Sequence, residues 1–416
     1  MPDLAVGASD GRPLLLRGGA ALWGAALEVT PFETLLVDRG RIAGLDVGAH
    51  APEDALVVDL DGAYVLPGLI DCHVHFDLAG HPAAYEHWRA PALVRSLTAL
   101  HNGLLALLRG ITTVRDLGCL DHSVLEYSAR VSAGQVVGPR VVAAGRGITT
   151  TGGHFSQYAR VADGASAVRT AVREQIGAGA GVVKLMATGG ISTPGDPGAS
   201  QLTVEEMSVA VEEAHRRGLK VAAHAHSRDG VLAALEAGVD TIEHAAFADD
   251  ETLHAMIAAE VTLVPTVSAL SPIAPGLGIP AATVTKSLRA RASYQDSTRR
   301  AIAAGVTIAA GTDAGTALNP IGGLVDELAL YVDLGMPASE AVRTATVTAG
   351  AVVGGGVGAL EVTGPADLVV VGQPPADDLE ALRRPTHVVS RGRLVDVQWA
   401  ERTVAELREI VTGGAA

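Results

Sequence analysis

Cysteine is almost missing from this sequence, whose 416 residues include only Cys72 and Cys119. The two form no CxxC pair, which excludes a cysteine-based zinc site, and two cysteines do not make a disulfide framework. A reducing compartment is the default for such a chain. The first residues also lack the basic segment and long apolar run of a signal peptide, so the cytoplasm is the expected location.

Aromatic residues are scarce as well, at 3% of the chain, and the formal net charge is −15 with no basic stripe. An acidic surface repels phosphate backbones, and few rings are available to stack on bases, so we expect no nucleic acid partner. No apolar run reaches membrane-spanning length, because the Ala- and Leu-rich stretch after Pro91 is interrupted by Arg95 and Arg109. The expected partner is a small-molecule substrate.

Hydrophobic residues, in contrast, make up 48% of the chain, and glycine occupies 49 positions, which suits a large core with many tight turns. Short β-branched runs alternate with Ala-, Leu- and Glu-rich segments of helical period. Eight such units can be counted, with strands expected at residues 69–76, 111–118, 140–149, 182–190, 220–227, 240–247, 261–268 and 306–315. Eight repeats of strand and helix are typical of a closed parallel barrel.

Both ends of the chain instead show short strands separated by glycine or aspartate turns. We therefore predict an α/β fold, in which residues 65–356 form a distorted (β/α)8 TIM-type barrel. Residues 1–64 and 357–416 are expected to form a small β-sandwich domain together. The segment at residues 400–410 has the pattern of a short terminal helix.

Two histidines, His73 and His75, lie in the first predicted barrel strand. Side chains of a strand alternate between its faces, so both histidines point to one side while Cys72 and Val74 face the helices. Two imidazoles on one rigid strand offer a metal two neighbouring ligands. An isolated HxH pair is nevertheless more often structural.

Further metal-compatible groups stand towards the C-terminal ends of predicted barrel strands, where the catalytic residues of such barrels are found. They are Lys184, His224, His244 and Asp313. Each alone has a structural explanation, but their coincidence on five strands predicts one shared site. Lys184 is the most informative, because a cation is costly to bury in an apolar strand and an ammonium has no lone pair for a metal. Its charge must be removed or reversed.

The ordered set of HVH, VKLMATGG, AAHAH, IEHA and GTDAG resembles the binuclear metal-dependent amidohydrolase superfamily. With VLPGLIDCHVH, TGGH and GPADLVVV, the chain is similar over essentially its whole length to one branch of it. That branch contains imidazolonepropionase-like proteins, prolidase-like Xaa-amino-acid dipeptidases and ochratoxinase-type amidases. Members often form homo-oligomers, which is an expectation here too, although no segment marks an interface.

The resemblance implies that CO2 carboxylates Lys184 and that the resulting carbamate bridges two divalent metal ions. It assigns His73, His75 and Asp313 to the first metal, and His224 and His244 to the second. Zinc is favoured for such nitrogen and oxygen ligands, with manganese, cobalt or iron as alternatives.

Two such metals lower the pKa of a bridging water, and the resulting hydroxide attacks a polarised carbonyl. Asp313 is expected to accept the proton of the water and to pass it to the leaving nitrogen. The predicted reaction is hydrolysis of an amide-type C–N bond in a dipeptide, such as Xaa-Pro, or in an N-acyl amino acid. The alternatives are a hydrolase of a xenobiotic amide, carbamate, urea or lactone, a heterocycle deaminase or ring-opening hydrolase, and a non-catalytic scaffold.

Three further side chains are expected to contact the substrate. His226 follows His224 by two residues on the same face and could replace it as a ligand, but the family pattern favours His224. A histidine at the place of His154 helps to polarise the substrate carbonyl in relatives, which makes His154 a second catalytic candidate. Tyr158 follows in the same loop, where the sequence departs from many relatives that carry small residues after TGGH.

Two other pairs of residues have a less direct relation to the site. Arg115 and Asp116 are expected to form a structural pair near the end of the second strand. His81 and His87 lie in the long loop after the first strand, which could cover the mouth of the barrel as a lid. Solvated loop histidines are the plainer interpretation.

Overall fold

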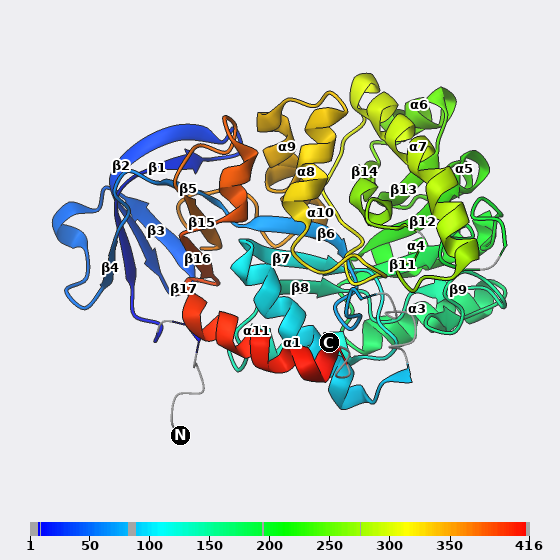
Figure 1. Cartoon of the computed structure of the whole chain (residues 1–416), viewed down its shortest axis with the longest axis horizontal. Helices are drawn as coiled ribbons and strands as arrows, with labels where there is room; N and C mark the ends of the chain where they lie inside the picture. Colours follow the sequence, from blue (N-terminus) through cyan, green and yellow to red (C-terminus); the bar gives the residue numbers. More distant parts are fainter. Residues whose placement is uncertain (1–6, 9, 82–88, 194, 275, 413–416) are drawn as a thin grey trace.

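The computed structural model describes residues 7–8, 10–81, 89–193, 195–274 and 276–412. A barrel of parallel strands wrapped by helices makes up most of the chain, and a sheet built from both chain ends lies at its side (Figure 1). This arrangement confirms the predicted α/β barrel with a small β domain.

Parallel strands from the middle of the chain form the barrel wall. In chain order they are β6 (Leu69–Val74), β7 (Ile111–Asp116), β8 (Arg140–Ala143), β9 (Ile148–Thr149), β11 (Val182–Met186), β12 (Lys220–Ser227), β13 (Thr241–Phe247) and β14 (Thr262–Val264). Hydrogen bonds divide them into a sheet of order β6–β7–β8 and a sheet of order β10–β9–β11–β12–β13–β14, in which β10 is Arg160–Val161.

The eighth predicted strand, residues 306–315, closes the barrel without forming a continuous strand. Leu263 on β14 pairs with Ile308 through an isolated parallel bridge. Backbone hydrogen bonds run from Ala309 N to Leu263 O (3.0 Å) and from Cys72 N to Ala310 O (2.9 Å). The segment therefore joins the two sheets, and it leads directly into Asp313.

Helices cover the outside of the barrel. They are α1 (Ala92–Leu108), α2 (Ser123–Ser132), α3 (Ala165–Gly177), α4 (Val204–His215), α5 (Arg228–Ala237), α6 (Asp250–Ala258), α7 (Ala281–Ala304), α8 (Leu324–Asp333), α9 (Ala338–Thr344) and α10 (Val347–Val353). The N-terminus of α4 is a capping box, in which the Thr203 side chain accepts the Glu206 N–H and the Glu206 carboxylate accepts the Thr203 N–H. This cap is readable in the sequence, and it fixes where the helix begins.

Strands from both chain ends form the small β domain. They are β1 (Leu14–Trp23), β2 (Glu28–Asp38), β3 (Arg41–Leu45), β4 (Leu56–Asp59), β5 (Tyr64–Pro67), β15 (Leu368–Val371), β16 (His387–Ser390) and β17 (Arg393–Leu394). The expected sandwich takes the form of one mixed sheet of order β17–β16–β15–β5–β1–β2–β3, with β4 also paired to β1. The terminal helix is α11 (Val397–Val411), which lies along α1 and ties the C-terminal segment to the barrel (Figure 1).

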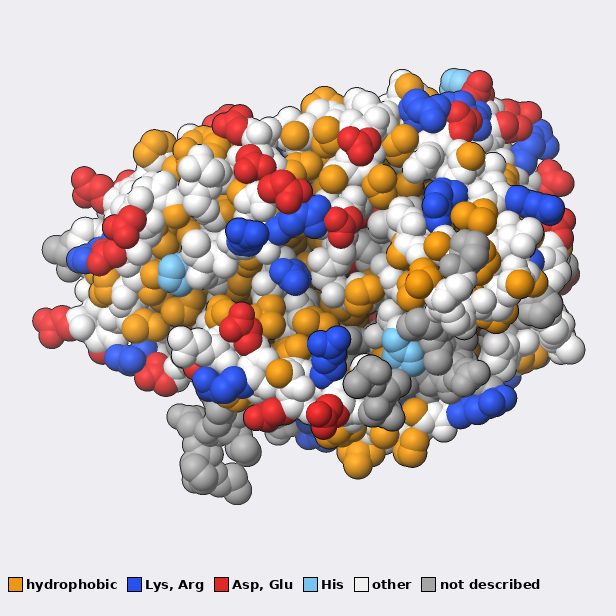
Figure 2. Space-filling model, in the orientation of Figure 1, with side chains coloured by type: hydrophobic (Ala, Val, Ile, Leu, Met, Phe, Trp, Pro, Cys, Tyr) orange, Lys and Arg blue, Asp and Glu red, His pale blue; other side chains and the backbone are white. Residues whose placement is uncertain are grey.

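The molecular surface carries charges of both signs. Figure 2 shows Lys and Arg side chains mixed with Asp and Glu side chains over the barrel and the small domain on this face. Among the described residues, every helix is too short or too polar to cross a membrane.

Candidate metal centre

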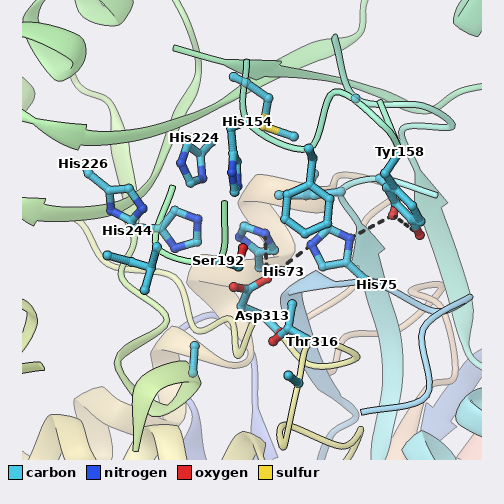
Figure 3. A pocket seen from close by; sticks show the side chains of 18 of the residues that line it. His73, His75, His154, Tyr158, Ser192, His224, His226, His244, Asp313 and Thr316 are labelled. Carbon is cyan, nitrogen blue, oxygen red and sulfur yellow. Dashed lines mark hydrogen bonds and ion pairs between the residues drawn. The ribbon is translucent and has the colours of Figure 1, made fainter. Parts of the chain in front are cut away.

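His73, His75 and Asp313 converge at the carboxyl end of the barrel (Figure 3). His73 lies in β6, His75 follows this strand, and Asp313 follows the irregular eighth segment. Asp313 Oδ1 lies 3.2 Å from His75 Nε2 and 3.5 Å from His73 Nε2. One ligand atom of each residue lies within 4.8 Å of the other two, which is close enough for the three to hold one metal ion.

The second nitrogen of each of these histidines has an outer partner. His73 Nδ1 lies 2.9 Å from Glu243 Oε2, and His75 Nδ1 lies 2.8 Å from Gly118 O. A carboxylate and a carbonyl can only accept, so both Nδ1 atoms carry the proton and both Nε2 lone pairs remain available beside Asp313. Outer partners of this kind orient histidines that bind metals.

A second group of ligand atoms comes from His224 on β12 and His244 on β13. Their ring centroids lie 4.7 Å apart, and that of His244 lies 5.0 Å from that of His73. His224 Nε2 lies 2.8 Å from Gly189 O and His244 Nδ1 lies 2.7 Å from Thr266 Oγ1. Burial holds the pKa of both histidines well below its usual value, so the rings are uncharged. Each ring therefore has one nitrogen left to offer a metal.

An extra residue in β13 brings two neighbouring side chains to His73. Between two register pairs, β12 advances by two residues and β13 by three, which is a β-bulge. His244 takes φ 76°, in the left-handed region that non-glycine residues rarely adopt. Glu243 consequently reaches His73 Nδ1 while the His244 ring lies beside the His73 ring.

Lys184 lies in β11 with 2% of its surface exposed, and its Nζ has no hydrogen-bond partner within the described structure. Its charge acts on His73 and Asp313 as well as on His224 and His244. Burial lowers the pKa of the amine to about 8, so more of it is uncharged at neutral pH than for a surface lysine. A buried amine without a partner, among two groups of ligands, fits a carbamate whose two oxygens face two metals.

His154 lies over the second group, in the loop after β9. Its ring stacks on that of His224 with centroids 4.3 Å apart and planes at 25°, and its Nδ1 lies 3.0 Å from Thr193 Oγ1. The ATGG segment permits this approach, because a Cβ on Gly190 would lie 2.1 Å from His154 Cε1. The preceding Gly189 supplies the carbonyl that holds His224. This motif therefore positions two predicted site histidines at once.

His226, the second histidine of β12, joins the same group. Its ring lies beside those of His224 and His244 (Figure 3), with centroids 4.5 Å and 5.0 Å away. Its Nδ1 lies 3.4 Å from the hydroxyl of Tyr294. Both histidines of β12 are therefore close to His244. The preference for His224 as the ligand stays a prediction.

Tyr158 and Phe155 form the wall of the pocket on the other side. The Tyr158 hydroxyl donates to Asp77, so the phenol already has an acceptor. The Phe155 ring lies parallel to that of His75, at 6.3 Å and 11°, and edge-on to that of His154, at 4.6 Å and 88°. Phe155, one of the residues that depart from many relatives after TGGH, thus packs against His75.

Glu243 was missed at the sequence level, and the expected pair of Arg115 with Asp116 is wrong. Arg115 Nη2 lies 2.8 Å from Glu243 Oε1, whereas Asp116 accepts the N–H of Phe76 at 2.7 Å. Neighbouring side chains of a strand point to opposite faces, which separates Arg115 from Asp116. The sequence signal available for Glu243 was its place in the IEHA motif, directly before the predicted ligand His244.

The loop after β6 is described only in part. His87 lies outside the described residues. His81 is described, and partial burial lowers its pKa. The function of this loop as a lid stays a prediction.

The predicted site residues line one pocket. His73, His75, His154, Tyr158, Lys184, His224, His226, His244 and Asp313 all belong to its wall. Further parts of the wall come from the segment after β14, from α7 and from residues near Ile191, among others. The structure therefore brings together every residue that the sequence suggested for the site.

A (β/α)8 barrel that carries histidines, an aspartate and a buried lysine at this end has the groups that a metal-dependent hydrolase needs. A sequence model of the amidohydrolase family matches residues 64–395. The chain belongs to this family and is a hydrolase.

Similarities to known proteins indicate the branch of the family to which this chain belongs. Ochratoxinase of Aspergillus niger is 32% identical over 380 residues, which cover 79% of this chain and 75% of that protein. The crystal structure of A. niger ochratoxinase matches with a TM-score of 0.79 at 28% identity, over 93% of this chain and 96% of that one. A crystal structure of a Xaa-Pro dipeptidase with bound methionine in its active site matches with a TM-score of 0.84 at 30% identity, over 92% of this chain and 99% of that one.

A segment of 56 residues is also 39% identical to imidazolonepropionase of Vibrio cholerae serotype O1, although it covers only 14% of each protein. Together these similarities confirm the prolidase- and ochratoxinase-like branch that the motifs indicated.

Proposed function

We propose that the protein hydrolyses an amide-type C–N bond with water activated at a pair of divalent metal ions. The observation that carries this proposal is the position of Lys184. Its amine is buried, has no hydrogen-bond partner in the described structure, and lies among both groups of ligands. A lysine kept for stability alone would need an anionic partner at such a depth. Carboxylation explains both its burial and its place.

The residues present fit two metal ions. His73, His75 and Asp313 would hold the first ion, His224 and His244 the second, and carboxylated Lys184 would bridge them. Nitrogen and oxygen ligands favour zinc, with manganese, cobalt or iron as alternatives. Such a pair of ions supplies a water of lowered pKa and polarises the carbonyl that is attacked.

Asp313 moves the proton in this proposal. Burial alone would raise the pKa of Asp313, but His73 and His75 beside it bring the pKa below its usual value, so the carboxylate is ionised. It accepts the proton of the attacking water and gives it to the leaving nitrogen. The C–N bond breaks as the amine departs with that proton. The carbonyl carbon keeps the hydroxyl of the water as a carboxylic acid, which releases its remaining proton to solvent and becomes a carboxylate.

His154 orients the carbonyl. Burial holds its pKa well below the usual value, so the ring is neutral and carries one N–H. When the Thr193 hydroxyl donates to Nδ1, which lies 3.0 Å away, the proton is on Nε2 and can be donated to the carbonyl oxygen. His226 and Tyr158 complete the proposed substrate contacts from opposite walls of the pocket.

The proposed substrates are a dipeptide, such as Xaa-Pro, or an N-acyl amino acid. The similarity to a Xaa-Pro dipeptidase supports this class. The similarity to ochratoxinase supports a second candidate, a xenobiotic amide.

The test is metal content per chain combined with hydrolysis of a substrate panel. Protein purified without chelators is expected to hold about two metals per chain, and to cleave at least one dipeptide, N-acyl amino acid or arylamide. Protein stripped by a chelator is the control, and zinc with bicarbonate should restore its activity. A chain that takes up no metal under these conditions contradicts the proposal and favours a scaffold.

A further inference from the structure

We infer that the pocket selects an uncharged amide whose substituent beside α7 is apolar, and that it disfavours a substrate with a free carboxylate there. The inference rests on the proposed function, and within it favours the second candidate, a xenobiotic amide, over dipeptides and N-acyl amino acids with a free carboxylate. It favours blocked dipeptides, anilides and similar amides over the corresponding free acids.

One part of the pocket wall is apolar. Ile191, Leu270 and Ile273 come from three places in the chain, and each is at most 7% exposed. They pack in one cluster with Tyr294 of α7. Contact with these side chains releases water only from an apolar substituent, so the wall favours one.

A neutral hydrogen-bonding group stands in this apolar wall. The Ser287 hydroxyl on α7 is buried, lines the pocket and has no hydrogen-bond partner within the described structure. Thr283 lies one helical turn earlier and also lines the pocket. A buried hydroxyl without a partner costs free energy until a ligand supplies one. A carbonyl oxygen or an N–H of the substrate is such a partner, and neither carries a net charge.

Positive charge is missing from the same wall. Every Lys and Arg of the sequence falls within the described residues, and Lys184 is the one among them that lines the pocket. Carboxylation would convert that one into an anion. Lys286 and Arg291 do not line the pocket, and they donate to backbone carbonyls, Lys286 to Thr193 O and Arg291 Nη2 to the carbonyls of Leu270 and Ile273.

The carboxylates near the pocket offer no cationic partner either. Asp313 lines the pocket as a proposed metal ligand, and Asp77 is buried behind Tyr158. A substrate carboxylate held beside α7 would lose its hydration without gaining a cationic partner from the protein, which is costly. An uncharged substituent in the same place avoids this cost.

Matched pairs of substrates test the inference on wild-type protein loaded with zinc and bicarbonate. One pair is leucyl-proline and its C-terminal N-methylamide, and the other is 4-acetamidobenzoate and acetanilide. Products identified by mass spectrometry show which C–N bond is cleaved. In each pair that is cleaved, we expect kcat/KM of the uncharged member to be at least about tenfold higher, which corresponds to about 1.4 kcal/mol.

The two hypotheses fail in different ways. Equal or faster cleavage of the free acids overturns the inference and leaves the proposed reaction standing. Cleavage of no member of the panel by protein that holds two metals removes the proposed reaction, and the inference with it.

Two variants examine the wall itself. Ser287→Ala is expected to raise KM for the preferred amide about three- to tenfold, as for the loss of one hydrogen bond, with little change in kcat. Thr285→Ala, on the exposed side of the same helix, is the matched control. An unchanged KM for Ser287→Ala contradicts the assignment of this hydroxyl to the substrate.

Ile273→Arg places a cation in the wall. It is expected to shift the preference towards the free acid of each pair by about tenfold or more. Leu277→Arg adds the same charge at an exposed position of the same segment and is expected to shift nothing. Melting temperatures confirm that both variants are folded, and an unshifted preference in folded Ile273→Arg counts against the inference.

Discussion

His73 on β6 donates its Nδ1–H to Glu243 on β13, across 2.9 Å of the buried barrel interior. Arg115 on β7 holds the other carboxylate oxygen at 2.8 Å. One carboxylate therefore joins three strands and fixes the ring that would hold the first metal. Because Arg115 and Glu243 are both at most 1% exposed, neither can exchange its partner for water.

The first prediction concerns this carboxylate. Glu243→Leu removes the acceptor of His73, so zinc affinity at the first site is expected to fall about 10- to 100-fold. Glu243→Gln keeps an oxygen that can accept from Nδ1, so its loss of affinity should be smaller. Competition with a chromophoric chelator measures both. Wild-type affinity in Glu243→Leu would show that the orientation of His73 does not depend on Glu243.

Loss of stability must be separated from loss of metal affinity in this experiment. Glu243→Leu also leaves the Arg115 guanidinium buried without its carboxylate, which costs about 3–5 kcal/mol in general. The double variant Arg115→Met with Glu243→Leu removes both charges, and we expect it to recover much of the stability but none of the affinity. Recovery of both would make the role of Glu243 purely structural.

The sequence sufficed for the parts of the site that depend on regular geometry. Strand alternation places His73 and His75 on one face, and the cost of burying a cation singles out Lys184. The eight repeats of strand and helix were enough to predict the barrel, and the Thr203 capping box was enough to predict where α4 begins. Each of these inferences uses a rule that acts within a few residues.

The parts that could not be predicted depend on irregular backbone or on distant partners. Strand alternation alone would put Glu243 and His244 on opposite faces, and the β-bulge that overrides it has no sequence signal of its own. Arg115 on β7 finds its partner on β13, in the other sheet of the barrel, instead of next to it in the chain. The eighth segment pairs only through isolated bridges, and Asp313 within it takes φ 56°.

The second prediction concerns Lys184. Lys184→Ala is expected to lose both paired metal binding and activity, because the bridging carbamate cannot form. Short carboxylic acids such as acetate are expected to restore part of both, since they supply two oxygens in the same space. Lys184→Arg is the matched control, because it keeps a cation that neither CO2 nor acetate converts into a ligand. Full activity with two metals in Lys184→Ala would remove the lysine from the site.

The third prediction concerns the substitution Asp313→Asn. The amide oxygen keeps a possible ligand atom, so much of the metal is expected to remain, whereas the proton acceptor is lost. Turnover should therefore fall about 10²- to 10⁴-fold, the usual range for a general acid–base group. Metal analysis and kcat are measured on the same preparation. Normal kcat would assign the proton transfer to another group.

The two histidines of β12 allow a fourth prediction. His226→Ala is expected to retain two metals per chain, and His224→Ala is expected to retain about one, because His224 has one nitrogen fixed by Gly189 O and the other left free. Both substitutions remove the same ring from the same strand, so each is the control of the other. The reverse result would exchange their roles and make His226 the ligand.

The last prediction lies outside the site, where α3 meets α4. Glu213 on α4 accepts from Arg173 at 2.9 Å and also from Arg169, both on α3, although its own side chain is only 6% exposed. The hydrogen bond from Arg173 outweighs the effect of burial and lowers the pKa of Glu213 to about 2. In the unfolded chain the same carboxyl has an ordinary pKa of about 4.5.

Because the folded-state pKa of Glu213 is the lower one, its contribution to stability is complete above pH 4.5 and is lost as the pH falls towards 2. Glu213→Gln is therefore expected to lower the melting temperature of the metal-free protein at neutral pH, by an amount that shrinks steadily below pH 4.5. The matched control is Glu212→Gln, since Glu212 is 54% exposed and exposed ion pairs contribute little. A difference between wild type and Glu213→Gln that stays constant with pH would mean that the side chain stabilises by packing, and that its charge is not what joins α3 to α4.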